Sequence, residues 1–218
     1  MLRSDAISLP HGFSTRQDDP DPAPPGFAKV VRLKQVHSAD VVAVEECYDF
    51  ARQYDADALV TNLPGVSLVI VTADCAPVLL ADAEAGVVAA CHAGWRGAVG
   101  GIIANTVQRM ADFGASPQRT TAIIGPTIAQ SSYEVDEAFR ANFEAGYARF
   151  FVEGRDGHWQ FDLPGYVAQR LRGAGVGTID DLALDTYADA DRFHSYRRAT
   201  HRNTTTGGRQ TSWIGLPS

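Results

Sequence analysis

Cysteine is scarce in this sequence, and its scarcity excludes the class of small proteins that are held together by disulfide bonds. The chain of 218 residues has 3 cysteines, and Cys47, Cys75 and Cys91 are too few and too scattered for a disulfide scaffold. Long apolar runs are missing as well, because the run at residues 66–71 is far shorter than the roughly 20 residues of a membrane-spanning helix. Residues 1–16 lack the apolar core of a signal peptide. These absences predict a soluble protein of the reducing cytoplasm.

Basic side chains are in the minority. The chain has 19 lysines and arginines against 26 aspartates and glutamates, and its formal net charge is −7. Such a surface repels nucleic-acid phosphates and anionic lipids, so we expect neither a nucleic-acid nor a membrane partner. The hydrophobic share of 45% is that of a globular protein, and the length suits one domain over residues 1–218.

Short valine-rich runs alternate with a few amphipathic stretches, and no Walker or dinucleotide-binding motif is present. The pattern predicts an α/β or α+β fold in which helices cover a sheet. A proline-rich surface loop is expected at residues 17–26. The expected strands are 28–33, 41–46, 56–61, 66–74, 77–83, 86–94, 120–125 and 209–216. The expected helices are 98–113, 134–151 and 163–171.

Three segments at strand ends carry residues that a stable fold alone does not require. They are Gln-Val-His at residues 35–37, Thr-Ala-Asp-Cys at 72–75 and His-Ala-Gly-Trp-Arg-Gly at 92–97. His37, Cys75 and His92 together form a sufficient ligand set for a catalytic zinc ion with its fourth position open.

Each of these residues has an ordinary alternative. A single cysteine is more often a small buried hydrophobe than a ligand, and a single histidine is more often a satisfied polar residue. Cys91 adjoins His92 on a strand, so the two side chains face opposite sides and Cys91 is assigned to the core. Cys47 lies in a polar run and is assigned no role. The neighbours Asp74 and Arg96 favour a site over core filling.

Arginines are concentrated near the C-terminus. This basic segment indicates either a solvated face or a local anion pocket, and Arg96 adds a guanidinium suited to phosphate or carboxylate. The arginines of the segment are Arg192, Arg197, Arg198, Arg202 and Arg209.

The motifs together resemble those of a known family. Gln-Val-His, Thr-Ala-Asp-Cys, His-Ala-Gly-Trp-Arg-Gly, Ser-Tyr-Arg-Arg and Thr-Gly-Gly-Arg-Gln occur in the order that is typical of the laccase-domain, or multicopper polyphenol oxidase, family. The resemblance implies a layered α/β/β/α sandwich similar to the catalytic domain of cytotoxic necrotizing factor. It also implies a metal ion bound by His37, Cys75 and His92.

The activities implied by the resemblance are those of a zinc-dependent purine nucleoside enzyme. They are phosphorolysis of adenosine, inosine, guanosine and methylthioadenosine, and hydrolytic deamination of adenosine; an older assignment is copper-dependent oxidation of phenols. Two features depart from the family. Asp185 stands where a cysteine is usual, and the interval before Gln35 is short and lacks a Gly-Gly-Val-Ser turn.

Three hypotheses follow: a zinc-dependent purine nucleoside phosphorylase and adenosine deaminase, a copper phenol oxidase, and a metal-binding protein without catalysis. The 6 histidines include no His-x-His pair, which disfavours a multicopper cluster. Deaminases of the cytidine type carry a glutamate two residues after the histidine ligand, but Gly94 stands there. Asp74 and then Asp185 are therefore the acid/base candidates. The candidate substrate- and phosphate-binding residues are Gln35, Arg96, Arg197 and Arg209.

Overall fold

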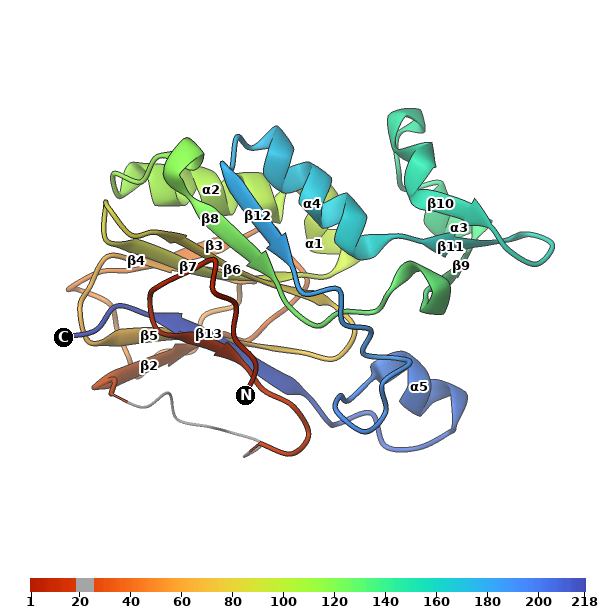
Figure 1. Ribbon diagram of the computed structural model, residues 1–218, viewed down its shortest axis with the longest axis horizontal. Coiled ribbons are helices and arrows are strands. Elements are labelled where there is room, and N and C mark those ends of the chain that lie inside the picture. Colours follow the sequence, from red (N-terminus) through yellow and green to blue (C-terminus); the bar gives the residue numbers. More distant parts are fainter. Residues whose placement is uncertain (19–25) are drawn as a thin grey trace.

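Two stacked β-sheets form the centre of the computed structural model, which describes residues 1–18 and 26–218 (Figure 1). The larger sheet has six strands in the order β12-β8-β6-β7-β4-β3. Most of the predicted loop at residues 17–26 lies outside the described residues. The strands of the larger sheet are β3 (Val41–Val44), β4 (Ala58–Thr61), β6 (Ala76–Asp82), β7 (Val87–Ala93), β8 (Thr121–Ile124) and β12 (Thr178–Asp181).

The centre of the larger sheet is an antiparallel pair of fully buried strands. Every residue of β6 and β7 is buried, which explains why both read as continuous apolar runs and not as alternating ones. Their register places Pro77 opposite His92. The start of β6 and the end of β7 therefore lie side by side at one edge of the sheet.

The smaller sheet covers one face of the larger one. It has the order β1-β13-β5-β2, and Gln210 of β13 is paired with Thr72 of β5. Leu68 and Ile70 of β5 pack with Leu79 of β6 in the core between the sheets. The strands of the smaller sheet are β1 (His11–Phe13), β2 (Lys29–Arg32), β5 (Val66–Thr72) and β13 (Gln210–Gly215).

Helices cover the other face of the larger sheet (Figure 1). They are α1 (Trp95–Gly100), α2 (Ile102–Asp112) and α4 (Leu163–Gly173). The apolar stripe predicted for residues 98–113 lies on the core side, with Ile103, Val107 and Met110 buried against the sheet. Gly101, at a φ of 100°, divides this predicted helix in two, because few residues other than glycine adopt that conformation.

The helix predicted for residues 134–151 is wrong. This segment contains β9 (Glu134–Asp136), the short α3 (Glu137–Arg140), a 3-10 turn at Ala145–Phe150 and the start of β10 (Phe151–Glu153). With β11 (His158–Phe161) they make a three-stranded sheet that projects from the two large sheets (Figure 1). The fourfold spacing of aromatic residues reflects packing around Phe161, with the Phe139 and Phe143 rings 5.3 and 4.9 Å from it.

The predicted α/β class and layered architecture are confirmed. The described residues form the layers α/β/β and lack the outer helical layer of the expected α/β/β/α sandwich, because α5 (Tyr196–His201) lies beyond the ends of β5 and β13 and not over the smaller sheet (Figure 1). Ser195 starts α5 by accepting a hydrogen bond from the Arg198 N–H. No described helix is long and apolar enough to cross a membrane.

A buried carboxylate, that of Asp82, lies at the C-terminal end of β6. Asp82 accepts hydrogen bonds from the Ser116 N–H at 2.8 Å, the Ala85 N–H at 3.1 Å and Arg119 Nη2 at 2.8 Å. Burial alone would raise the pKa of Asp82, but these hydrogen bonds outweigh it and lower the pKa below its ordinary value.

We expect Asp82→Asn to reduce the free energy of unfolding by about 1–3 kcal/mol at pH 7, because a buried hydrogen-bonded charge is lost. A lowered folded-state pKa stabilises the protein above the ordinary aspartate pKa of about 3.9, and this stabilisation is lost as the pH falls through the lowered value. Urea titrations at several pH values test this. Asp55→Asn is the control, because Asp55 pairs with Lys34 on the surface. Equal effects of the two substitutions at pH 7 would contradict the prediction.

Candidate metal centre and its cavity

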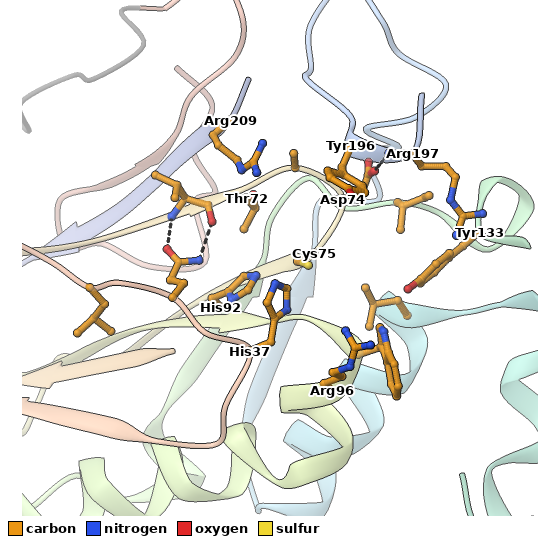
Figure 2. Close-up of a pocket in the computed structure, with 17 residues that line it drawn as sticks. His37, Thr72, Asp74, Cys75, His92, Arg96, Tyr133, Tyr196, Arg197 and Arg209 are labelled. Atoms are coloured by element: carbon orange, nitrogen blue, oxygen red, sulfur yellow. Dashed lines mark hydrogen bonds between the residues drawn. The ribbon is translucent and has the colours of Figure 1, made fainter. Parts of the chain in front are cut away.

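A cavity of about 580 Å³ opens where β5 and β7 end and β6 begins. His37, Cys75 and His92 line it, together with Trp95 and Tyr133. Figure 2 shows Arg96, Arg197 and Arg209 around the same space. The three sequence segments singled out above therefore contribute to a single cavity.

The three predicted metal ligands lie together. One possible ligand atom from each of His37, Cys75 and His92 lies within 4.8 Å of the others. Ligand atoms around a tetrahedral zinc ion are about 3.3–3.7 Å apart, given metal–ligand distances near 2.0–2.3 Å. Small side-chain rotations suffice for that closure, so the cluster could hold a metal ion. Within residues 1–18 and 26–218 it is the one group of three such side chains this close together.

The side chains of two candidate ligands occupy the space that a side chain at position 94 would need, and Gly94 has none. A Cβ atom at this position would lie 2.7 Å from His37 Nδ1 and 3.1 Å from Cys75 Sγ. Gly94 has a φ of −69°, which any residue adopts, so the requirement for glycine here is steric and not conformational. The site is thus shaped by the absence of a side chain as well as by the three ligands.

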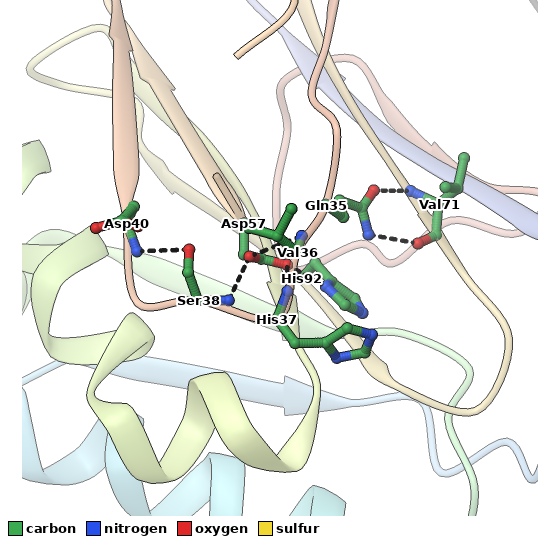
Figure 3. Close-up of polar contacts among 8 residues, drawn as sticks. All are labelled: Gln35, Val36, His37, Ser38, Asp40, Asp57, Val71 and His92. Atoms are coloured by element: carbon green, nitrogen blue, oxygen red, sulfur yellow. Dashed lines mark hydrogen bonds and ion pairs between the residues drawn. The ribbon is translucent and has the colours of Figure 1, made fainter. Parts of the chain in front are cut away.

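One buried carboxylate orients both histidines (Figure 3). Asp57 is fully buried, and its oxygens accept hydrogen bonds from the backbone N–H groups of Val36 at 3.2 Å, His37 at 3.0 Å and Ser38 at 2.6 Å. The same carboxylate lies 2.7 Å from His92 Nδ1. His37 has a φ of 61°, a conformation unusual for histidine, and the hydrogen bonds to Asp57 hold the turn in that conformation.

The charge state of Asp57 defines the protonation of His92. Burial alone would raise the pKa of Asp57, but the hydrogen bonds from His92, Ser38 and His37 lower it to about 2. An ionised carboxylate only accepts hydrogen bonds, so His92 Nδ1 carries the proton. His92 Nε2 is then the nitrogen that can bind a metal ion, the usual carboxylate–histidine–metal arrangement.

The two imidazoles differ in their electrostatic surroundings. Burial lowers the pKa of His37, and the positive charges of His92 and Arg96 lower it further, which favours the neutral, ligating form. Burial also lowers the pKa of His92, but the hydrogen bonds to Asp57 and Cys75 outweigh it and raise the pKa to about 9. A metal ion that binds His92 therefore has to displace a proton.

Sequence reasoning missed Asp57. Its position directly before the buried strand β4 was the available signal, because an aspartate flanked by apolar residues is rarely buried without a partner. The partner residues lie about 20 and 35 positions away along the chain, at His37 and His92. Only the folded structure shows that one carboxylate accepts hydrogen bonds from both the His37 backbone and the His92 ring.

Asp74, a predicted acid/base residue, lines the cavity, but both of its carboxylate oxygens already accept hydrogen bonds. Oδ1 accepts from Thr186 Oγ1 at 2.7 Å, and Oδ2 accepts from Ser195 Oγ at 3.0 Å and the Arg197 N–H at 2.7 Å. Asp74 thus links two segments, the loop that contains Cys75 and the start of α5. This link positions Arg197.

Asp185, the other predicted acid/base residue, does not line the cavity. It accepts hydrogen bonds from Ser132 Oγ at 2.6 Å, the Tyr187 N–H at 2.9 Å and the Ala129 N–H at 3.3 Å. These contacts hold the turn that precedes Tyr133. Asp185 therefore stabilises the segment that leads to Tyr133, which lines the cavity.

The predicted substrate-binding residues all line the cavity, in different settings. The Gln35 amide pairs with the backbone N–H and C=O of Val71, both at 2.8 Å, as a neighbouring strand would. The guanidinium of Arg96 lies 4.6 Å from the centre of the Trp95 ring. Arg209 donates to the carbonyl of Gly208 at 2.8 Å.

The other two cysteines lie away from the cluster. Cys91 is fully buried in the core beneath α2, and burial raises the pKa of its thiol to about 12. Cys47 is exposed on the surface. Both observations agree with the assignment of Cys75 as the one cysteine of the candidate site.

The chain belongs to the family described as multi-copper polyphenol oxidoreductase laccase, whose sequence profile matches residues 24–217. The suspected laccase-domain family is thereby confirmed. A relative in Deinococcus radiodurans is named purine nucleoside phosphorylase and is 40% identical over 246 aligned positions, covering 100% of this chain and 93% of the relative. A Rickettsia conorii protein with the same name is 37% identical and covers 79% of this chain and 72% of its own length.

Solved structures of similar proteins agree with the fold. A protein of Neisseria meningitidis has a TM-score of 0.77 and 34% identity, covering 87% of this chain and 76% of its own. YlmD from Geobacillus stearothermophilus has a TM-score of 0.76 and 31% identity, covering 87% of this chain and 74% of its own. The arrangement of layers described above is therefore shared by proteins of the family.

We expect Asp57→Asn to weaken metal binding about 10–100-fold, because the amide cannot hold both histidines as the carboxylate does. Chelator competition with purified protein measures the affinity. Asp40→Asn is the control, because this nearby aspartate is exposed and its backbone, not its carboxylate, bonds to Ser38. An unchanged affinity in Asp57→Asn would contradict the orienting role.

We expect Gly94→Ala to displace the His37 ring and so reduce metal affinity at least tenfold, while the melting temperature of the metal-free protein changes little. The added methyl group meets a movable side chain and not the backbone. Calorimetric titration with metal and thermal unfolding separate the two effects. Tight metal binding by the alanine variant would show that the cluster is looser than its geometry indicates.

Proposed function

We propose that this chain is a zinc-dependent purine nucleoside phosphorylase that cleaves adenosine, inosine, guanosine and methylthioadenosine. The names of the relatives in Deinococcus radiodurans and Rickettsia conorii support a purine nucleoside substrate. The single observation that carries the proposal is that the candidate metal ligands and three arginines face one cavity of about 580 Å³. That volume suits a nucleoside and an anion together.

The charge of the cavity favours an anionic co-substrate. Asp74 is the one carboxylate among the described residues that line the cavity, and its oxygens are occupied by hydrogen bonds. Arg96, Arg197 and Arg209 supply positive charge and N–H donors. Phosphate matches such a lining, because guanidinium groups bind its oxygens in pairs.

In phosphorolysis a phosphate oxygen forms a bond to C1′ of the ribose while the C1′–N9 bond breaks and its electron pair moves to the purine. The proton lost by hydrogen phosphate ends on the purine, so the reaction needs no added acid. Arginines among these lining residues hold the phosphate and offset its charge. A bound zinc ion would supply Lewis-acid polarisation of a substrate atom or activation of water.

The ligand set and its surroundings favour zinc over copper. One thiolate and two imidazoles suit either metal, but a blue-copper site usually adds a weak methionine ligand. Met110 is on the core side of α2 and is buried, and Met1 Sδ accepts a hydrogen bond from Trp213 Nε1 at 3.0 Å. Neither methionine lines the cavity.

Adenosine deamination is the second candidate activity. The candidate metal ligands line an open cavity, which leaves room for a water beside the cluster. Asp74 is the available proton carrier, and it would have to give up a hydrogen bond from Thr186, Ser195 or Arg197 to act. We therefore expect deamination to be slower than phosphorolysis.

Metal analysis combined with nucleoside assays tests the proposal. We expect one zinc ion per chain, and free base with ribose-1-phosphate from inosine only when phosphate is present. Cys75→Ala should lose the metal and at least 99% of the activity, whereas Cys47→Ala, which changes an exposed cysteine, should retain both. Copper at unit stoichiometry with turnover of phenols, or zinc without turnover of any nucleoside, would contradict the proposal.

A further inference from the structure

Tyr133 presents a free hydroxyl to the cavity. Figure 2 shows its hydroxyl end directed into the space between Cys75 and Arg96. Within the described part of the chain, this hydroxyl has no hydrogen-bond partner. A partly buried phenol without a protein partner, in the wall of a substrate cavity, is available to a ligand.

The ring that carries this hydroxyl is held firmly. Phe139 and Phe161 pack against it with ring centres 5.8 Å away, and the Arg197 guanidinium lies 5.2 Å from its centre. The backbone is fixed as well, because the Phe161 N–H donates to the Tyr133 carbonyl at 3.0 Å. The hydroxyl position is therefore set before any ligand arrives.

Two cations flank Tyr133. Burial raises the pKa of the Tyr133 phenol and outweighs the lowering effect of the Arg197 and Arg96 charges, so the phenol stays protonated and can donate. Arg96 makes no hydrogen bond to any described residue, and Arg197 uses Nη1 to donate to the Glu134 carbonyl at 2.7 Å. We call the part of the cavity lining formed by Arg96, Tyr133 and Arg197 the Tyr133 wall; it offers several N–H groups and one O–H group to a ligand.

The third arginine lies elsewhere. Figure 2 shows Arg209 on the opposite side of the cavity from Tyr133, beyond Thr72. The pairing of its neighbour Gln210 with Thr72 keeps Arg209 at the end of the smaller sheet. A single tetrahedral anion on the Tyr133 wall is therefore not shared with Arg209.

We propose that Arg96, Tyr133 and Arg197 form the phosphate subsite, in which the Tyr133 hydroxyl donates a hydrogen bond to a phosphate oxygen. This inference rests on the proposed phosphorolysis and refines it, since Arg209 then faces the nucleoside. Tyr133 keeps its proton throughout. Its hydrogen bond orients the phosphate oxygen that attacks C1′, while the proton lost by hydrogen phosphate ends on the purine.

Binding of inorganic phosphate to the metal-loaded protein tests the subsite without turnover. Tyr133→Phe keeps the packed ring and removes the donor, so we expect the phosphate Kd and the phosphate KM to rise about 10–100-fold. The nucleoside KM should stay within twofold. Tyr147→Phe is the matched control, because the Tyr147 hydroxyl bonds to Arg170 outside the cavity. Arg209→Gln should leave the phosphate Kd within twofold.

The outcomes separate this inference from the proposed function. Phosphorolysis with an unchanged phosphate Kd and KM in Tyr133→Phe would overturn the subsite and leave the function standing. A raised phosphate Kd in that variant, with no phosphorolysis by the wild type, would support the subsite and overturn the function. Absence of both phosphate binding and phosphorolysis would overturn both. Arg96→Gln, which changes an exposed side chain, gives the same readout if Tyr133→Phe folds poorly.

Discussion

One buried carboxylate is the constraint on which the candidate site depends. Asp57 bonds at once to the backbone of the turn that carries His37 and to the ring of His92. Because Asp57 is ionised, the His92 proton lies on Nδ1 and Nε2 is the nitrogen that can bind a metal ion. The hydrogen bonds from the turn to Asp57 keep His37 in an unusual backbone conformation. Without this carboxylate, the two imidazoles, which come from distant parts of the chain, would lose the hydrogen bonds that fix their relative orientation.

A second aspartate organises the opposite side of the cavity. Asp74 joins the loop before Cys75 to Ser195 and to the backbone of Arg197. The loop that carries Cys75 and the backbone of Arg197 are therefore joined by hydrogen bonds, which is the kind of preorganisation that electrostatic catalysis requires. The two aspartates thus position the candidate metal ligands and Arg197, all of which line the cavity.

The sequence predicted the fold class, the strands β2 to β8 and β13, and the helices α2 and α4, because apolar periodicity and burial on two faces are local signals. It did not predict the short strands β1 and β12. It also pointed to His37, Cys75 and His92, whose ligand atoms lie within 4.8 Å of one another. It misread residues 134–151, where aromatic residues pack around Phe161 and do not line one helix. The roles of Asp57, Asp74 and Tyr133 depend on contacts between distant segments, and no local pattern encodes such contacts.

The most direct test of the central claim is X-ray absorption spectroscopy of the protein purified with its metal. The account predicts zinc with one sulfur neighbour at about 2.3 Å and two imidazole nitrogens at about 2.0–2.1 Å, the signature of one thiolate and two histidines around a single ion. A first coordination sphere without sulfur, or one made of oxygen atoms alone, would contradict it.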